Sequence, residues 1–336
     1  MTSISGRFVT EELPSPGQHH SGLGDGAVST QRADRIFRWL MTGSGLLVVA
    51  MVVLIAIFLV TQAIPALLAN SANFVTSRDW VTAQPMSFGI LQLLWTTVST
   101  SVVALVVAVP VSICVALFIT QYAPTWLAKP AAALVDLLAA VPSIIYGLWG
   151  AYVVAPQFVP IQNWMGTWLG WIPFFRPVGT VTGGTTIFLI GLVLSVMVLP
   201  IVTAITREVF AQAPRAHQEA ALALGATKWE TIRIAVLPFG RAGIISASML
   251  GLGRALGETI AVLLILSALP GGTEWTWSLF NGGETFASKI AADAAELTPG
   301  LGTGAYIAAG LVLFILTFVV NAAARVVIAR RAAFSE

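Results

Sequence analysis

Six long apolar segments limit what this chain can fold into. Each has at least the roughly 20 residues that a helix needs to cross a bilayer. Of the 336 residues, 57% are hydrophobic and only 10% are charged, whereas soluble domains carry about 25% charged residues. Backbone polar groups find no water inside lipid, so such segments cross it as helices. We therefore predict an all-α integral membrane protein with six transmembrane helices, near residues 45–68, 90–120, 131–155, 185–205, 242–269 and 303–328.

Two shorter stretches precede the first apolar segment. Residues 1–30 are rich in Ser, Gly, Thr and Pro and lack apolar periodicity, which is typical of a disordered tail. In residues 31–42, Arg32, Arg35 and Arg38 recur every third residue among apolar side chains. We predict a short amphipathic helix there, with its arginines toward lipid headgroups. Residues 43–331 then form one membrane domain of six helices.

The distribution of Lys and Arg predicts the orientation of the helices. Loops on the cytoplasmic side of a membrane carry an excess of these residues. With the amino terminus inside, Arg78, Arg176 and Lys289 fall outside and Arg254 falls within a helix. Both termini are therefore predicted to face the cytoplasm, because the rest of the 17 basic residues then fall inside: Arg7, Arg32, Arg35, Arg38, Lys129, Arg207, Arg215, Lys228, Arg233, Arg241, Arg325, Arg330 and Arg331.

A polar stretch from Arg207 to Arg241 separates the fourth and fifth apolar segments. Residues 218–224 are helix formers, and Gly225 is suited to end a helix. Residues 227–234 predict a second short helix, which Pro238 is expected to end. With the predicted orientation, this helix-turn-helix lies at the cytoplasmic surface. The alternative is an ordinary amphipathic loop between two membrane helices.

Two charged residues interrupt the fifth apolar segment. Arg254 lies about 20 Å along a continuous helix from Arg241, and Glu258 lies about 6 Å further on the same face. A lone charge at this depth costs on the order of 2.5–3.5 kcal/mol on insertion scales. We predict that both residues line a substrate path, where a guanidinium can bind an oxyanion through paired donors. The alternative is that the two charges only neutralise each other and hold helices together.

Glycines surround this charged pair. Gly253 and Gly257 form a small-xxx-small pair, which allows another helix to approach closely. Gly251 reduces the bulk of the same neighbourhood. We therefore predict that these three glycines serve helix packing.

The third apolar segment offers a second candidate for the substrate path. Pro142 is expected to break the helix there and to leave amides near Ser143 available to an anion. Packing is the alternative role for Ser143. Asp136 lies nearer the inner surface, where we expect it to pair with Lys129 or with the polar stretch 207–241.

The spacing within the polar stretch resembles the loop of ABC-transporter permeases on which a separate ATPase subunit docks. The matching residues are Glu219, Ala220, Ala221, Gly225, Leu237 and Pro238. Ala235 stands where the family has isoleucine, although Ile232 and Ile234 can supply apolar contact nearby. We call residues 207–241 the coupling loop. The resemblance implies that ATP binding moves its short helices about Gly225 and switches the membrane helices between outward and inward access.

Residues 140–150 and 252–259 resemble the C-type (PstC) permeases of phosphate-specific ABC importers, and the similarity extends from about residue 32 to residue 331. This resemblance implies a type I ABC importer permease fold in the cytoplasmic membrane of a bacterium. It also implies three kinds of partner: an A-type permease subunit in a heterodimer, two copies of a cytoplasmic ATPase, and an extracytoplasmic phosphate-binding protein. In that family the positions of Arg254 and Glu258 are associated with the passage of inorganic phosphate.

Glu258 has a specific expected role toward this substrate. Monohydrogen phosphate can donate a hydrogen bond to a carboxylate, whereas fully deprotonated sulfate cannot. Our hypothesis is that Arg254 attracts the anion and Glu258 selects phosphate. A permease for another oxyanion, such as sulfate, molybdate or a phosphonate, is the main alternative, because substrate choice rests mostly with the binding protein.

Nothing in the sequence indicates catalysis by this chain. It has no Gly-x4-Gly-Lys-[Ser/Thr] motif, which would bind ATP. We therefore expect that this chain binds no cofactor and that the separate ATPase subunit hydrolyses the ATP. His19, His20 and His217 lie outside the apolar segments, so we expect no metal site. We expect the chain to contact membrane lipid and not to bind nucleic acid. A stand-alone ion-coupled anion carrier is an alternative, but it has no use for the coupling loop. A subunit that mainly signals phosphate status is another.

Overall fold

The computed structural model describes residues 24–177, 183–269, 275–297 and 300–332, and for residues 24–33 and 327–332 it describes the backbone alone. The chain divides into two units, residues 1–57 and 58–336. The described part of the first unit is a single stretch of the helix α1 (Gly24–Ala69), and all the other elements belong to the second unit.

Helices dominate the second unit, in agreement with the predicted all-α class. After α1 the elements are, in chain order, β1 (Trp80–Val81), β2 (Ser87–Phe88), α2 (Leu91–Leu117), the π-helix η1 (Phe118–Tyr122), α3 (Thr125–Ala139), α4 (Ser143–Trp149), the π-helix η2 (Gly150–Val154), α5 (Ala155–Leu169), the 3-10 helix η3 (Pro173–Phe175), α6 (Ile187–Ala211), α7 (Arg215–Ala223), α8 (Lys228–Thr231), the π-helix η4 (Ile232–Val236), α9 (Leu237–Leu256), α10 (Ile260–Ile265), α11 (Phe286–Asp293) and α12 (Leu301–Ala332).

Six helical stretches among the described residues are long and apolar enough to cross a membrane. They are Asp34–Ala69, Leu91–Tyr122, Ser143–Leu169, Ile187–Ala211, Lys228–Leu256 and Leu301–Val326. The number of spans agrees with the prediction, and so do the positions of the first, second, fourth and sixth. The third and fifth differ, because both predicted segments contain a break.

The amino-terminal region differs from its prediction. Residues 1–23 of the predicted tail lie outside the described residues, but residues 24–30 are helical. The amphipathic helix predicted over residues 31–42 is not a separate element, because α1 runs through it without interruption. Once a helix has started, each further residue adds one hydrogen bond, so the helix continues until a residue interrupts it. The first proline within α1 is Pro65, so no proline interrupts residues 31–42.

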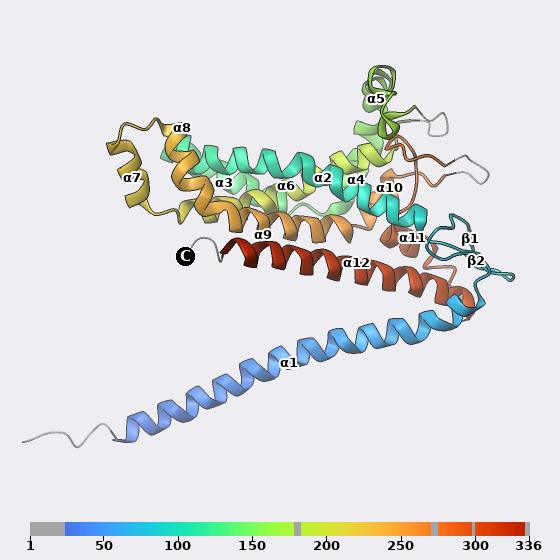
Figure 1. The fold of residues 1–336 in the computed structure, drawn as a ribbon, viewed down its shortest axis with the longest axis horizontal. Coiled ribbons are helices and arrows are strands. Elements are labelled where there is room, and N and C mark those ends of the chain that lie inside the picture. The colour runs from blue at the N-terminus through green and yellow to red at the C-terminus, as the bar shows by residue number, and fades with distance from the viewer. Residues whose placement is uncertain (1–23, 178–182, 270–274, 298–299, 333–336) are drawn as a thin grey trace, which may run out of the picture. The chain divides into compact units, whose positions relative to one another are not determined.

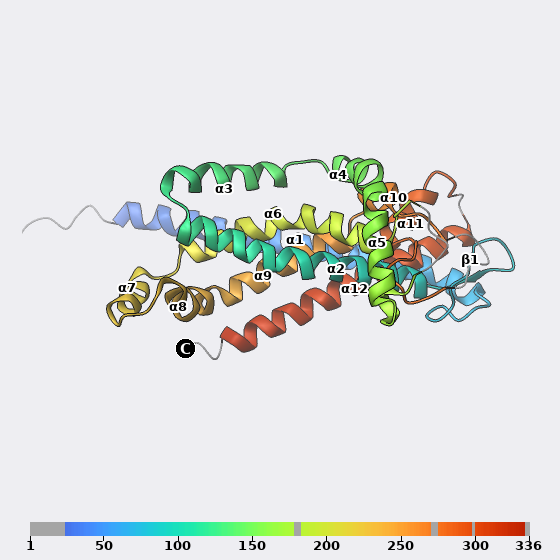
Figure 2. The same ribbon diagram turned by 90° about the horizontal axis from the view of Figure 1, so that it is seen from above.

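The predicted break in the third segment is present at Pro142. The helix α3 begins earlier than predicted, at Thr125, and lies beside α6 until it ends at Ala139 (Figure 2). Pro142 has extended backbone angles, and α4 starts at Ser143. α5 then lies across the long direction of α2, α6 and α9, as Figure 1 and Figure 2 show.

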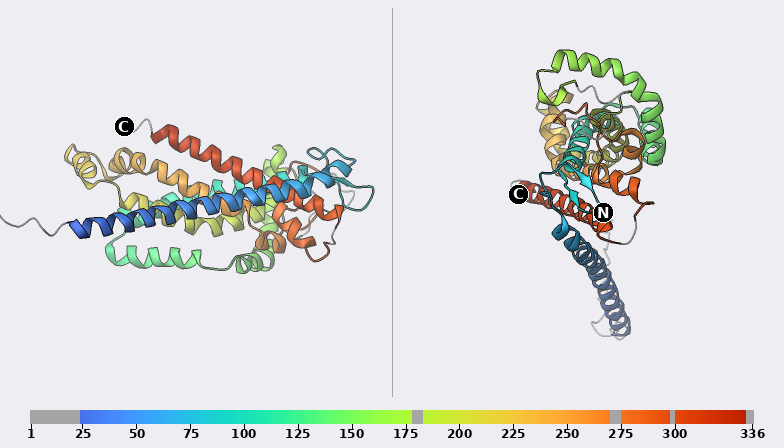
Figure 3. Two further views of the ribbon diagram at one scale, coloured as in Figure 1. Left: turned by 90° about the horizontal axis from the view of Figure 1, so that it is seen from below. Right: turned by 90° about the vertical axis from the view of Figure 1, so that its right-hand side faces the viewer.

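The two ends of the second unit carry different elements. Figure 1 shows α7 and α8 at one end, and α5, α11 and the β1–β2 hairpin at the other. Figure 3 shows α12 running along the unit toward the α7 end. The coupling loop and the last turns of α12 therefore share one end of the helical unit.

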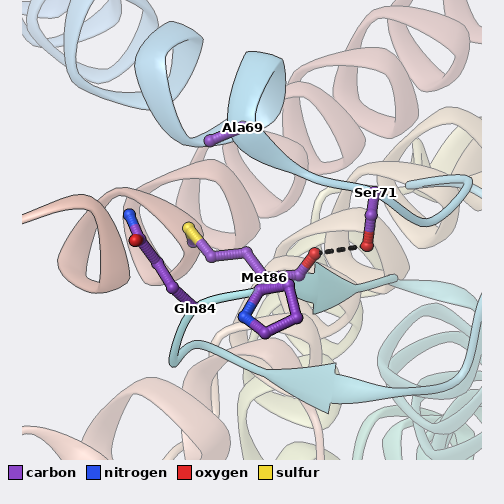
Figure 4. A pocket seen from close by; sticks show the side chains of 5 residues that line it. Ala69, Ser71, Gln84 and Met86 are labelled. Atoms are coloured by element: carbon purple, nitrogen blue, oxygen red, sulfur yellow. Dashed lines mark hydrogen bonds between the residues drawn. The ribbon is translucent and has the colours of Figure 1, made fainter.

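A shallow cavity of about 430 Å³ lies between the end of α1 and the hairpin, away from α7. Figure 4 shows Gln84 and Met86 beside it, with the Ser71 hydroxyl donating to the Met86 carbonyl oxygen at 2.6 Å. Ala69 and Pro85 complete its lining. None of these five side chains carries a charge, so the cavity is not a candidate for binding an oxyanion.

The helix α6 forms the centre of the second unit. Of its span, 67% is buried, against 17–33% for the other spans in this unit. Buried residues of α2, α4, α9 and α10 pack around it in one apolar cluster. Glycines allow the closest contacts: Gly191 of α6 meets Val103 of α2, and Gly251 of α9 meets Val198 and Val202 of α6.

Gly251→Ala is expected to lower the free energy of unfolding by about 1–3 kcal/mol, as overpacking in cores does. A Cβ atom at this position would lie 2.6 Å from Val198 Cγ1 and 2.9 Å from Val202 Cγ2. Gly253→Ala is the matched control. No atom lies within 4 Å of its Cβ position, so the higher helix propensity of alanine should leave stability equal or increased. Thermal unfolding of both variants in detergent tests this, and equal midpoints would contradict it.

Candidate functional site

The predicted fifth span is not one continuous helix. α9 ends at Leu256, Gly257 takes φ −94° and ψ 0°, and α10 begins only at Ile260. The expectation that Arg254 and Glu258 share a helix face is therefore wrong. The break is held by local hydrogen bonds, because the Thr259 hydroxyl donates to the Gly257 carbonyl oxygen at 3.1 Å.

The carboxylate of Glu258 stabilises the second half of this broken helix. Its Oε1 accepts a hydrogen bond from the Ala261 backbone N–H at 3.1 Å, and the residue is 9% exposed. A buried carboxylate needs such donors, because burying it without partners is costly. Glu258 therefore closes the first turn of α10 on its amino-terminal side.

Arg254 is exposed at the end of α9 and makes no hydrogen bond or ion pair with any residue that the structure describes. The alternative in which it neutralises Glu258 is thus absent from the described geometry. Among the described residues, therefore, a guanidinium without a bonded partner lies two residues before the end of α9 at Leu256.

The break at Pro142 lies next to the break in the fifth span. The short helix α4 packs against α10: a Cβ atom at Gly147 would lie 2.9 Å from Leu264 Cδ1 and 3.0 Å from the Ala261 Cα. Across the Pro142 break, the Tyr146 hydroxyl donates to the Leu138 carbonyl oxygen at 2.9 Å. This bond fixes the angle between α3 and α4.

Ser143 is the first residue of α4 and is partly exposed. No hydrogen bond of its side chain is described within the part of the chain that the structure covers. Tyr146 lies within residues 140–150, which carry the family resemblance, but the sequence assigns it no role of its own. The only sequence signal for such a role is a tyrosine four residues after a helix-breaking proline.

The three predicted packing glycines behave differently. Gly251 makes the close approach to α6 described above. Gly253 has no atom within 4 Å of its Cβ position, and at Gly257 the nearest is the Gly253 carbonyl oxygen at 3.5 Å. Within the described part of this chain, therefore, no second helix approaches the face that carries Gly253.

The first half of the coupling loop forms the predicted helix and turn. α7 spans Arg215–Ala223, and Gly225 has φ 85°, the left-handed conformation that favours glycine. The Gly225 N–H donates to the Leu222 carbonyl oxygen at 3.0 Å, and the Ala226 N–H donates to the Ala221 carbonyl oxygen at 3.1 Å. This pair of bonds is the Schellman arrangement, in which the glycine closes the helix.

The second half differs from the prediction at Pro238. A capping box starts α8, where the Thr227 N–H donates to Glu230 Oε2 at 2.7 Å and the Glu230 N–H donates to Thr227 Oγ1 at 3.3 Å. The helix then continues through η4 into α9, and Pro238 lies in the first turn of α9 instead of ending α8. Proline is common in the first turn of a helix, and the π-helical turn η4 marks the point at which α9 starts.

Apolar side chains attach the coupling loop to the membrane helices. Ile232 and Val236 are buried against the end of α2, at Ala116 and Leu117, and against Phe210 near the end of α6. Of the two isoleucines predicted to compensate for Ala235, Ile232 is therefore the anchor, whereas Ile234 is 60% exposed. The remaining matched residues divide by exposure: Ala221 is buried, Leu237 is partly buried, and Glu219, Ala220 and Pro238 are exposed.

Asp136 pairs with the boundary of the coupling loop and not with Lys129. Arg207 Nη2 donates to both Asp136 carboxylate oxygens at 3.4 Å. Arg207 itself lies in α6, which extends to Ala211, so the first residues of the predicted loop are helical. The carboxylate is 53% exposed, and such a pair contributes about 0–1 kcal/mol. The pair marks where α3 and α6 lie side by side and adds little to their packing.

A second charged cluster lies at the opposite end of the unit, on α11. Lys289 Nζ lies 3.2 Å from Glu284 and 3.1 Å from Asp293, and the Tyr306 hydroxyl donates to Asp293 at 2.7 Å. Burial works to lower the pKa of Lys289, but the two carboxylates outweigh it and the pKa lies above its usual value. The cluster is internally paired and connects α11 to α12, so it has a structural role.

Comparisons with known proteins identify the family of the chain. Residues 108–332 match the model of the family described as binding-protein-dependent transport system inner membrane component. The phosphate transport system permease protein PstC 2 of Mycobacterium tuberculosis is 55% identical over 303 residues, which cover 88% of this chain and 92% of the relative. The protein named PstC of Xylella fastidiosa (strain 9a5c) is 36% identical over 304 residues, covering 89% and 91%.

Two solved structures share the fold. One is a bacterial ABC transporter involved in the import of the acidic polysaccharide alginate, with a TM-score of 0.55 and 18% identity over 89% of this chain and 99% of that one. The other is the MetNI methionine ABC transporter in an inward-facing conformation, with a TM-score of 0.51 and 15% identity over 74% and 99%. The chain therefore belongs to the family of binding-protein-dependent transport system inner membrane components.

Proposed function

We propose that this chain is a membrane-spanning permease subunit of an ATP-driven importer that carries inorganic phosphate across the cytoplasmic membrane of a bacterium. The single observation that carries the proposal is the guanidinium of Arg254, which has no bonded partner among the described residues and lies beside two adjoining helix breaks. Proteins named phosphate transport system permease are similar over about nine tenths of the chain, which supports phosphate as the anion.

Arg254 serves in this proposal as the attracting group of the substrate path. An exposed guanidinium in a membrane span needs a partner, and none of the described residues supplies one. Its planar array of donors matches the oxygens of a tetrahedral anion. Ser143, at the neighbouring break, presents a hydroxyl and sits where α4 begins. We assign Ser143 to the same path.

ATP supplies the energy through the coupling loop. Import of a dianion against an inside-negative potential costs about 2.3 kcal/mol per charge per 100 mV, or roughly 4.6 kcal/mol in total. The proposed orientation has both termini and the coupling loop in the cytoplasm, where two ATPase copies dock. The proposed partners within and outside the membrane are an A-type permease subunit and an extracytoplasmic phosphate-binding protein. This chain itself needs no cofactor in the proposal.

Uptake by the complete complex tests the function. The chain is co-purified with the A-type permease subunit and the ATPase and is reconstituted into liposomes. ATP and the phosphate-loaded binding protein are then added. Radiolabelled phosphate should accumulate only with ATP, and excess sulfate or molybdate should not compete. Phosphate uptake by this chain alone, without the ATPase, would show instead an ion-coupled carrier. Preferential uptake of another oxyanion would overturn the substrate assignment.

Glu258→Gln is expected to reduce the preference for phosphate over sulfate by about tenfold, since a hydrogen bond to a charged group contributes about 1.5–3 kcal/mol. The glutamine Oε1 can still accept the hydrogen bond from the Ala261 N–H that Glu258 accepts. The variant therefore keeps the start of α10 and removes only the charge that favours a protonated anion.

Glu258→Ala provides the control for this prediction. It removes the charge and the bond to Ala261 together, so thermal stability should fall for alanine and not for glutamine. Competition between labelled phosphate and unlabelled sulfate in proteoliposomes measures the preference. If the glutamine variant keeps the wild-type uptake and preference, Glu258 does not select the substrate and only holds α10.

A further inference from the structure

Lys228 and Tyr122 form a contact that the sequence does not reveal. The Lys228 ammonium lies 4.6 Å from the centroid of the Tyr122 ring, within the range of a cation–π interaction. Lys228 is the first residue of α8 in the coupling loop. Tyr122 is the last residue of η1, which prolongs α2. The contact therefore joins the coupling loop to the connection between α2 and α3.

This connection is short and internally bonded. The Ala123 N–H donates to the Phe118 carbonyl oxygen at 2.8 Å. Pro124 precedes α3, and its carbonyl oxygen accepts from the N–H groups of Leu127 and Ala128, each at 2.9 Å. Only Ala123 and Pro124 therefore separate Tyr122 from the first residue of α3.

The far end of α3 reaches the substrate path. Asp136 pairs with Arg207 where α3 lies beside α6. Two residues further, the Leu138 carbonyl oxygen accepts the Tyr146 hydroxyl across the Pro142 break. Tyr146 belongs to α4, which packs against α10 beside the break in the fifth span. The single helix α3, which contains Pro130, therefore leads from the residues next to Tyr122 to the break at Pro142.

We propose that the Lys228–Tyr122 contact transmits movement of the coupling loop to α3 and so to the substrate path. The inference rests on the proposed function, because it assigns a route to ATP-driven movement. Lys228 and Tyr122 are positioning residues and touch no substrate. Their contact differs from the apolar anchor at Ile232 and Val236, which holds the same loop on α2 and α6.

The two side chains can be replaced without disturbing the core. Lys228 is exposed and Tyr122 is 49% exposed. Tyr122→Phe and Lys228→Arg keep a ring and a cation, whereas Tyr122→Leu and Lys228→Gln remove one partner each. The wild type, Tyr122→Leu, Lys228→Gln and the double variant Tyr122→Leu/Lys228→Gln form a double-mutant cycle, and Tyr122→Phe and Lys228→Arg are its conservative controls.

The measurement is the amount of phosphate accumulated per ATP hydrolysed by the whole complex in proteoliposomes. Tyr122→Phe and Lys228→Arg should match the wild type. Tyr122→Leu and Lys228→Gln should each lower the ratio by about two- to fivefold, the range that a cation–π contact at an exposed site supports. The double variant should lower it no further than either single variant. The amount of ATPase that co-purifies should be the same for all.

Three results would overturn the inference while leaving the proposed function standing: a wild-type ratio in Tyr122→Leu and Lys228→Gln, losses that multiply in the double variant, or a loss confined to Lys228→Gln together with lost ATPase. The first means that the contact transmits nothing. The second means that the two residues act separately, and the third that Lys228 only binds the ATPase. A wild-type complex that hydrolyses ATP without accumulating phosphate would overturn both proposals together.

Discussion

Arg254→Ala should lower ATP-dependent phosphate uptake by the reconstituted complex by about 100-fold or more. Hydrogen bonds to a charged group contribute about 1.5–3 kcal/mol each. Loss of two such bonds to the anion corresponds to at least that factor, since each 1.4 kcal/mol is tenfold. Arg254 has no bonded partner among the described residues, so its removal leaves no buried carboxylate unpaired. The loss should appear in transport and not in folding.

Arg254→Lys separates charge from geometry. Lysine keeps the positive charge but cannot offer paired, coplanar donors, so uptake should fall to a value between wild type and Arg254→Ala. Arg325→Ala, at an exposed position of α12, should transport like the wild type and excludes a general effect of lost charge. Uptake of labelled phosphate and thermal unfolding are measured on all three variants. Transport by Arg254→Ala at the wild-type rate would remove Arg254 from the substrate path.

Gly225→Val should lower the phosphate accumulated per ATP by about tenfold while ATP hydrolysis continues. Gly225 has φ 85°, and this conformation costs most L-residues roughly 1–2 kcal/mol and a β-branched residue more. No atom lies within 4 Å of its Cβ position, so the effect comes from the backbone and not from a collision. The turn between α7 and α8 must change, and the loop no longer moves as a unit.

Gly225→Asn is the matched control for the valine variant. Asparagine adopts the left-handed conformation more readily than other side chains, so its ratio of uptake to hydrolysis should lie near that of the wild type. Gly225→Ala should fall between asparagine and valine. Both activities are measured in the same proteoliposomes. If valine couples as well as glycine does, the conformation at this turn is not needed for coupling.

Much of the fold follows from local signals in the sequence. The apolar segments predicted six spans because length and composition alone decide whether a helix can cross lipid. Gly225 predicted the turn because it can adopt a positive φ without cost. Pro142 predicted a break because a proline removes a backbone donor and fixes the chain around it. In each case one residue determines its own surroundings.

The errors have a common physical origin. Pro238 can end one helix or occupy the first turn of the next. Which of the two occurs depends on the π-helical segment η4 before it, and the sequence pattern does not predict that segment. The helix break after Leu256 depends on Glu258 accepting the Ala261 amide in place of the helix carbonyl. The apolar pattern of the sequence does not show that a side chain replaces a carbonyl oxygen as acceptor. The pattern predicted a continuous helix and therefore wrongly placed Glu258 on the same helix face as Arg254.

Contacts between distant segments were beyond sequence reasoning for a different reason. Lys228 and Tyr122 lie more than a hundred positions apart, and nothing in either neighbourhood marks them as partners. For Asp136 the sequence predicts a partner that is either Lys129 or a residue of the coupling loop. It does not single out Arg207, with which Asp136 pairs. Such contacts become visible only when the packing of α2, α3 and α6 is known.

The close glycine contacts on both sides of α6 determine where the transporter can flex. Gly191 fixes α2 to α6, and Gly251 with Gly240 fixes α9 to α6, each with no spare space for a methyl group. Sliding between these three helices would bring atoms into steric clash, because protein interiors are packed as densely as crystals of small organic molecules. We therefore expect these three helices to move together as one rigid body. The chain can bend instead at residues 140–142 and 257–259, where the backbone leaves its helix.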